Sequence, residues 1–238
     1  MVIFLIAFVL LLVIGVPISI SIGASAVLGC LSLGYPLVVI GQKMVSGIDS
    51  FLLIAVPLFI LAGNLMNAGK ITEKIFDTAK ELVGWIPGGL GHANVVASII
   101  FAGMSGSAVA DAGGLGAIEM EAMKKNGYDE DFAGAVTAAS SVIGPIFPPS
   151  IPLIIYGSVA SVSVDQLFMG GVVPGLLMGV LLMVMVLYFA IVRRYERHPF
   201  RLRALIRQFL GSIPALITPV IILCGFVVGW FTPTEASS

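Results

Sequence analysis

Residues 101–116 read FAGMSGSAVADAGGLG, and this stretch decides the fold. It lies within strongly apolar sequence, yet it contains five glycines, two serines and Asp111. A bilayer tolerates helix-breaking glycines and bare hydroxyls where the backbone lines a cavity or is buried in protein. An ionisable side chain there indicates a functional site. The stretch predicts the tip of a broken, re-entrant helix pair that holds an ion or substrate near the membrane midplane; close packing of helices through small residues is the alternative.

The composition is that of a polytopic membrane protein. Of the 238 residues, 58% are hydrophobic and 11% are charged, whereas about 25% are charged in a typical soluble domain. One crossing needs about 20 apolar residues, so several fit. The first apolar stretch lacks a basic n-region and a clear cleavage site, which favours a retained membrane segment. Nothing in the sequence indicates nucleic-acid binding, and the two cysteines lack the spacing of a metal site.

The first third of the chain predicts spans and one surface helix. Residues 1–33 are apolar but interrupted at Gly15-Val16-Pro17, which predicts one kinked span or two short helices and leaves the side of the N-terminus open. Residues 50–66 predict the next span. In residues 70–85, apolar and charged side chains fall on opposite helical faces, which predicts a helix lying in the membrane interface.

Two short helical limbs flank the opening stretch. The first begins after Pro87 and runs to Phe101, and the second runs from Val109 to about Lys125. Each limb is about 25 Å long at a rise of about 1.5 Å per residue, which is short for a crossing. The charged residues that end the second limb must reach water. The pattern therefore predicts a re-entrant hairpin.

A second interruption follows at residues 144–152, GPIFPPSIP, where four prolines exclude a continuous helix. Broken helices expose carbonyl oxygens that suit Na⁺ and amide hydrogens that suit anionic groups. Two such breaks at one depth can build an all-oxygen site, since hard cations prefer oxygen ligands. The hydroxyls available to it are those of Ser105, Ser107, Ser140 and Ser141. This combination favours a secondary transporter.

Six of the twelve basic residues are arginines between positions 193 and 207. The positive-inside rule places this connector in the cytoplasm. The span before it, residues 167–192, then enters from outside, and Lys124 and Lys125 lie inside. The hairpin is therefore expected to open to the cytoplasm, with its tip at the midplane.

A four-residue motif raises a second function class. Gly103-Met104-Ser105-Gly106 matches the G-x-S-G motif of rhomboid-type intramembrane serine proteases. Such an enzyme needs a histidine base within hydrogen-bonding reach of the serine. His198 lies in the arginine connector, and His92 lies about three turns before Gly103 on the same limb. This geometry disfavours the protease, and we expect no enzyme.

Four segments carry a family resemblance: GMSGSAVADAGGLG at 103–116, GPIFPPSIPLIIYG at 144–157, TPTEAS at 232–237 and PLFILAGNLMNAG at 57–69. Over essentially its whole length the chain resembles the large, DctM-type membrane subunit of tripartite ATP-independent periplasmic (TRAP) transporters. The resemblance implies Na⁺-driven import, without ATP, of a small carboxylate of the C4-dicarboxylate or sialic acid class. It implies a multi-pass protein of the bacterial inner membrane, with a small membrane subunit and a periplasmic substrate-binding protein as partners. Na⁺ is the coupling ion, and no other cofactor is expected.

The resemblance also implies an all-α elevator built as an inverted repeat, of which this chain holds the first repeat. The implied parts are scaffold helices at 1–69, an amphipathic arm at 70–86, half of a transport domain at 87–165 (hairpin 87–126, broken helix 130–162), a span with an Arg-rich cytoplasmic arm at 166–211, and the start of a second repeat at 212–238. Family members are roughly twice as long, as inverted repeats require. We therefore expect an N-terminal half that does not transport by itself.

The site residues follow from the two breaks and the resemblance together. The predicted cation ligands, which are also the whole predicted metal site, are Ser105, Gly106, Ser107, Ser141, Gly144, Pro145 and Pro148, acting largely through backbone carbonyls. The predicted substrate-binding residues are Ser107, Asp111 and Ser150. Asp111 either adds charge to this site or caps the second limb near its N-terminus.

Overall fold

A computed structural model describes residues 2–195, 202–228, 230, 232, 234 and 235. Every regular element within these residues is a helix, which confirms the predicted all-α class. Arg197, His198, Phe200 and Arg201 of the predicted arm lie outside the described residues, as do three positions of the TPTEAS segment.

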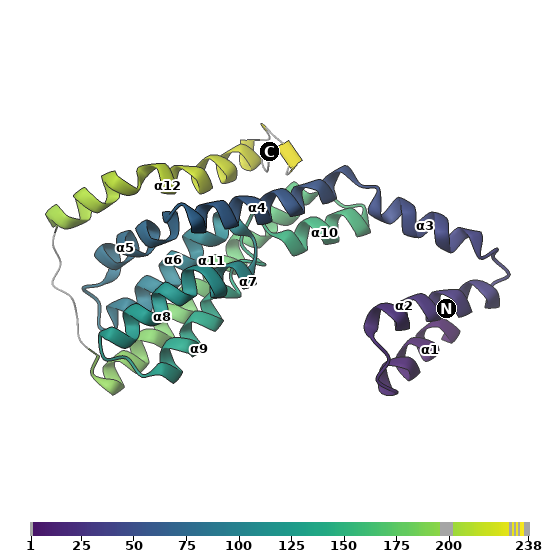
Figure 1. Cartoon of the computed structure of the whole chain (residues 1–238), viewed down its shortest axis with the longest axis horizontal. Helices are drawn as coiled ribbons and strands as arrows, with labels where there is room; N and C mark the ends of the chain where they lie inside the picture. The colour runs from purple at the N-terminus through teal and green to yellow at the C-terminus, as the bar shows by residue number, and fades with distance from the viewer. Residues whose placement is uncertain (1, 196–201, 229, 231, 233, 236–238) are drawn as a thin grey trace. The chain divides into compact units, whose positions relative to one another are not determined.

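From α1 to α11 the helices follow one another along the chain, most of them with short connections (Figure 1). Their bounds are α1 Val2–Val13, α2 Ile18–Ser32, α3 Val38–Ile48, the 3₁₀ helix η1 Phe51–Ile54, α4 Ala55–Ala68, α5 Ile71–Val83, α6 Gly89–Ser105, α7 Ala108–Ala110, the π-helix η2 Asp111–Leu115, α8 Gly116–Lys125, α9 Glu130–Ser141, α10 Ile151–Ala160, α11 Val164–Arg193 and α12 Leu202–Val228. They form two compact units, residues 1–50 and residues 51–238.

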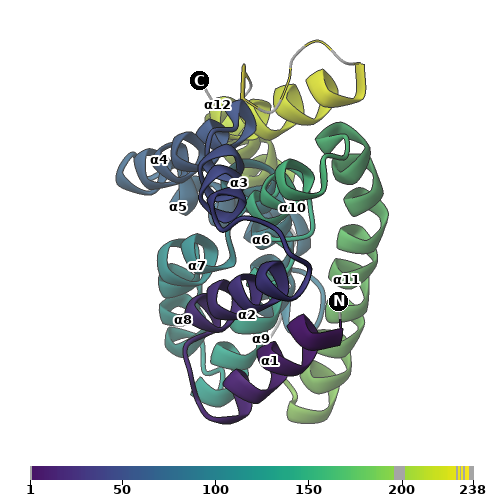
Figure 2. The same ribbon diagram turned by 90° about the vertical axis from the view of Figure 1, so that its right-hand side faces the viewer.

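The first unit contains α1, α2 and α3. α1 and α2 lie side by side as a hairpin (Figure 2). The turn between them contains Gly15, with a φ of +88°, and Pro17, so the interruption separates two short helices. Gly29 of α2 lies against Phe4 of α1, close enough that a Cβ on Gly29 would be 3.4 Å from the Phe4 Cβ. Much of the remaining surface is aliphatic and exposed, as expected of helices that face lipid.

In the second unit, two helical stretches of the described residues are long and apolar enough to cross a membrane: Phe51–Ala68, which joins η1 to α4, and α11. Both coincide with predicted spans. The two parts of α12, Leu205–Ile213 and Leu216–Ile222, meet at a bend of 65° and would make a third span if taken together.

The amphipathic helix α5 buries its apolar face against protein. Ile75 and Ala79 are fully buried, and α5 packs on α6 and α12. The Thr78 hydroxyl donates to the Ser212 hydroxyl of α12 at 2.8 Å. The face predicted to enter the membrane interface is therefore largely covered by neighbouring helices, and only Leu82 at its edge stays exposed.

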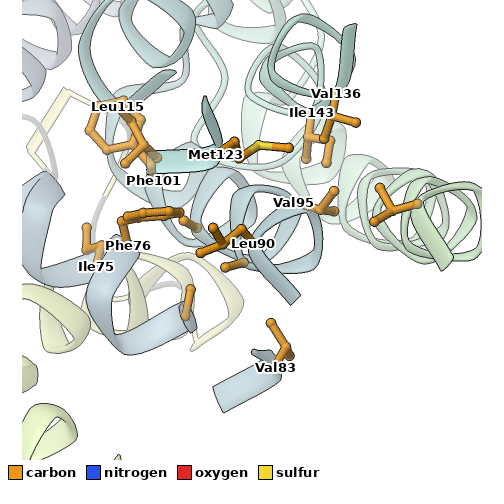
Figure 3. Close-up of a cluster of buried hydrophobic side chains, with 14 of the residues drawn as sticks. Ile75, Phe76, Val83, Leu90, Val95, Phe101, Leu115, Met123, Val136 and Ile143 are labelled. Atoms are coloured by element: carbon orange, nitrogen blue, oxygen red, sulfur yellow. The ribbon is translucent and has the colours of Figure 1, made fainter. Parts of the chain in front are cut away.

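α6 lies at the centre of the second unit. Its apolar side chains share a core with those of α5, α8 and α9 (Figure 3). The long helix α11 closes this core through small residues, which let membrane helices approach closely. A Cβ on Gly91 of α6 would be 2.8 Å from Val186 of α11.

One polar cluster fastens α9 to the end of α11. Arg193 pairs with Asp129, the residue before α9, and its guanidinium lies 5.5 Å from the centre of the Phe132 ring. Tyr195 also donates to Asp129, at 2.8 Å. The hydrogen bonds from Tyr195 and Arg193 lower the pKa of the Asp129 carboxyl, so this carboxylate stays ionised at neutral pH.

Candidate ion and substrate site

The first helix break lies at Gly106. α6 ends at Ser105, and Gly106 adopts a left-handed conformation with a φ of +60°. Glycine takes this conformation without the strain that a Cβ would impose. The Ser107 hydroxyl then accepts from the Ala110 amide at 3.3 Å and caps the second limb. The predicted interruption is confirmed, and its local cause is a glycine followed by a serine cap.

Asp111 begins the π-helix that follows. Its side chain is 1% exposed, and neither carboxylate oxygen has a hydrogen-bond partner among the described residues. The cap of the limb is Ser107, so the alternative in which Asp111 caps this helix is wrong. π-helices are rare and often mark functional sites.

The second break separates α9 from α10. Ser150 begins α10: its hydroxyl accepts from the Leu153 amide at 3.2 Å and donates to the Pro145 carbonyl. The Ser141 hydroxyl donates back to the Ala138 carbonyl of its own helix at 2.9 Å. Both hydroxyls are thus engaged in local structure. Pro148 is buried within the break.

The two breaks are in direct contact. The Ile151 amide donates to the Gly106 carbonyl at 3.3 Å. A Cβ on Gly106 would lie 2.5 Å from the Pro149 carbonyl oxygen, and a Cβ on Gly144 would lie 3.3 Å from the Ser107 carbonyl carbon. Of the predicted cation ligands, Gly106, Ser107 and Gly144 are therefore brought together, with Ser105 directly adjacent.

This junction combines helix ends of opposite polarity. α6 and α9 end here with their carbonyl groups, and α10 begins here with its amide groups. Carbonyl ends attract cations and amide ends attract anions. The junction therefore provides oxygen ligands of the kind that Na⁺ prefers. The described residues contain no cluster of His, Cys, Asp and Glu that could hold a transition metal.

A buried polar network ties the first limb to α9. The Asn94 amide nitrogen donates to the Thr137 hydroxyl at 2.8 Å, and the Ser140 hydroxyl donates to the Asn94 amide oxygen at 2.7 Å. Ser98 donates to Ser140 at 3.1 Å. The network holds the two limbs that carry the breaks in register.

We expect Asn94→Ala to lower the free energy of unfolding by about 1–3 kcal/mol, because it removes both buried hydrogen bonds of the Asn94 amide, to the Thr137 and Ser140 hydroxyls. Thermal unfolding of the purified chain in detergent measures the effect. Asn126→Ala is the matched control, because Asn126 is exposed and water can replace its bond to the Ala122 carbonyl. Equal losses in the two variants would contradict a stabilising role for the network.

A cavity of about 490 Å³ opens between α4 and the hairpin tip. From the tip side it is lined by Ser105 and Ser107 together with the glycines of the π-helix, and from α4 by Asn64 and Asn67. Asp111 and Ser150, two of the three predicted substrate residues, do not line it. Pockets of this size are typical of small-molecule sites.

The sequence carries a signal for the α4 side of the cavity. Ile60, Gly63, Asn64 and Asn67 recur at the helical spacing i, i+3, i+4 and i+7, which places two amides on one stripe of an apolar helix. The contribution of Asn94 was equally unpredicted, because its partners lie more than 40 residues away along the chain.

Among the described residues, Ser105 has no histidine hydrogen-bonded to it, as the catalytic serine of a protease requires. Its hydroxyl accepts from the Ser107 amide at 3.5 Å. Both ring nitrogens of His92 are buried without a hydrogen-bond partner among the described residues, so neither is hydrogen-bonded to Ser105. His198 lies outside the described residues.

Comparison with known proteins decides the family. The model of the tripartite ATP-independent periplasmic transporter DctM component matches residues 5–238. The chain belongs to the DctM family. It is 51% identical to a sialic acid TRAP transporter large permease protein of Vibrio cholerae, over 83% of this chain and 46% of that relative. It is 50% identical to a sialic acid TRAP transporter permease protein of Haemophilus influenzae, over 82% of this chain and 32% of that relative. It is 37% identical to a C4-dicarboxylate TRAP transporter large permease protein of Vibrio cholerae, over 96% of this chain and 51% of that relative.

The chain thus spans about half the length, or less, of these curated relatives. Its relatives are transporter permeases, and its apolar helices are those of an integral membrane protein. The two contacting breaks and the cavity beside them lie within the residues that the family model matches.

Proposed function

We propose that this chain is part of the membrane permease of a Na⁺-coupled TRAP-type secondary transporter that imports a small carboxylate of the C4-dicarboxylate or sialic acid class. The observation that carries the proposal is the contact between the two breaks, where the Ile151 amide meets the Gly106 carbonyl. Discontinuous helices that meet in this way are suited to binding a coupling ion and an anionic substrate together.

The proposal includes the setting of the protein. The chain lies in the bacterial inner membrane with a small membrane subunit and a periplasmic substrate-binding protein as partners. Arg193, Arg194, Arg203 and Arg207 face the cytoplasm, which orients the hairpin tip toward the midplane. The division into scaffold, arms and a moving transport domain, as an elevator requires, belongs to the same proposal.

We expect the complete transporter that contains this chain, reconstituted in liposomes with its binding protein, to take up labelled carboxylate only when an inward Na⁺ gradient is present. Labelled sialic acid and labelled succinate are the two probes, and an equal K⁺ gradient is the control. Uptake that persists with K⁺ or requires ATP would contradict Na⁺ coupling. Covalent capture of Ser105 by a fluorophosphonate would favour a protease instead.

A further inference from the structure

The wall that α4 contributes to the cavity is chemically unusual for an apolar helix. Phe51–Ala68 is hydrophobic enough to cross a membrane, yet it carries Asn64 and Asn67 on the stripe that lines the cavity. Polar amides within an apolar span are costly unless they find hydrogen-bond partners. The Asn64 and Asn67 side chains form no hydrogen bond with another described residue, so their amides are not explained by the folding of the chain around the cavity.

Asn67 is held in place by close packing. Gly114 of the π-helix lies so close that a Cβ there would be 2.2 Å from the Asn67 amide nitrogen. The Asn67 amide oxygen is buried and has no hydrogen-bond partner among the described residues. A buried acceptor left unpaired is destabilising, so a ligand group that reaches it and donates a hydrogen bond is favoured.

The opposite wall offers matching groups. Ser107 uses its oxygen to accept from the Ala110 amide, so its hydroxyl hydrogen remains available to a ligand. Gly63 of α4 lies against Ser105, with a would-be Cβ 3.4 Å from the Ser105 Cβ, and both residues line the cavity. The cavity thus presents amides on one side and a hydroxyl on the other.

The lining favours an uncharged, hydroxylated ligand surface. None of the described residues that line the cavity is charged, and Phe59, Ile60 and Val109 add apolar surface. A carboxylate buried against such a lining would lose its hydration without gaining a counter-charge. Hydroxyl groups, in contrast, both donate and accept, as the asparagine amides do.

We propose that this cavity recognises the hydroxyl groups of a sugar acid, and that Asn64 and Asn67 select a polyhydroxylated carboxylate over a C4-dicarboxylate. The inference rests on the proposed transport function and adds to it the substrate class and two specificity-determining residues. Ionised succinate, a C4-dicarboxylate without hydroxyl groups, has no hydrogen to donate to the unpaired Asn67 amide oxygen. Sites that hydrogen-bond substrate hydroxyls reject analogues lacking them strongly, for this reason.

The test compares sialic acid with succinate in the complete transporter. We expect Na⁺-dependent uptake of labelled sialic acid that excess succinate does not inhibit. Asn67→Leu should raise the half-saturating concentration of sialic acid about 10-fold, and Asn64→Leu with Asn67→Leu about 100-fold, since one hydrogen bond of about 1.4 kcal/mol corresponds to a factor of ten. The half-saturating Na⁺ concentration should not change. Asn126→Leu, at an exposed asparagine away from the cavity, is the control.

A second measurement does not depend on transport. In a background with Cys30→Ser and Cys224→Ser, a cysteine introduced as Asn64→Cys should react with a methanethiosulfonate reagent, and sialic acid should protect it while succinate does not. Asn64 is exposed, so this variant is expected to fold. Protection by succinate alone, or by neither compound, would overturn the inference.

The outcomes distinguish failure of this inference from failure of the proposed transport function. Na⁺-dependent sialic acid uptake with unchanged half-saturation in the double variant overturns the roles of Asn64 and Asn67 and leaves the proposed function standing. Na⁺-dependent uptake of succinate without competition from sialic acid overturns the substrate class alone. Absence of Na⁺-dependent uptake of both compounds by the unaltered transporter overturns the proposed function and this inference with it.

Discussion

Gly106→Val is expected to abolish Na⁺-dependent uptake or to raise the half-saturating Na⁺ concentration at least about 10-fold. Gly106 has a φ of +60°, a conformation that costs a β-branched residue on the order of 1–3 kcal/mol. In addition, the new Cβ would lie 2.5 Å from the Pro149 carbonyl oxygen, so the tip and the proline break must move apart. A separation of this kind removes carbonyl ligands that both segments are proposed to share.

Gly127→Val separates the conformational strain of a positive φ from the steric clash with the proline break. Gly127 also has a positive φ, of +80°, but no atom lies within 4 Å of its would-be Cβ. This variant carries the same conformational strain in a loop and leaves the junction intact, so its half-saturating Na⁺ concentration should equal that of the unaltered transporter. Initial uptake rates over a series of Na⁺ concentrations give the half-saturating Na⁺ concentration of each variant. If the two variants shift the Na⁺ dependence equally, the coupling ion is not bound at the junction.

Gly171→Val is expected to have the largest effect on folding. Gly171 lies on α11 where this helix supports the proline break, and a Cβ there would be 2.3 Å from the Ile146 carbonyl oxygen. A backbone atom cannot move aside as a flexible side chain can, so the loss should reach or exceed about 3 kcal/mol, the upper end for overpacked sites. For a chain of this size that corresponds to a decrease in Tm of roughly 6–12 °C.

The adjacent glycine provides the control for this prediction. Gly170 is exposed, and nothing lies within 4 Å of its would-be Cβ. Gly170→Val makes the same chemical change in the same helix, so it should shift the Tm of the purified protein in detergent by at most a degree or two. A similar decrease for both variants would mean that the contact with Ile146 does not set the effect.

Helix boundaries were largely predictable because their causes are local. Gly106 followed by Ser107 ends one helix and caps the next, and the prolines after Gly144 stop α9. The partners of α5 were not predictable, since an amphipathic pattern shows that one face is buried but not what covers it. The π-helix at Asp111 also has no sequence signature as clear as that of a glycine or proline.

The site was predictable to the extent that it depends on backbone breaks. Gly106, Ser107 and Gly144 meet as expected, whereas the Ser150 hydroxyl, predicted to bind substrate, is engaged with Pro145 and Leu153. A serine before a helix serves equally well as a cap or as a ligand, and only its contacts decide between the two. The spacing of Asn64 and Asn67 gains meaning only once α4 is seen beside the hairpin tip.

The contact between the two breaks has a consequence for the engineering of hybrid permeases. Each break provides part of the other's surroundings: the Ile151 amide is satisfied by Gly106, and the Pro149 carbonyl oxygen occupies the space that a side chain at Gly106 would need. A donor hairpin grafted alone would therefore meet a foreign proline loop. Residues 101–116 and 144–152 therefore act as one structural unit, and exchanging either segment between related chains calls for moving both together.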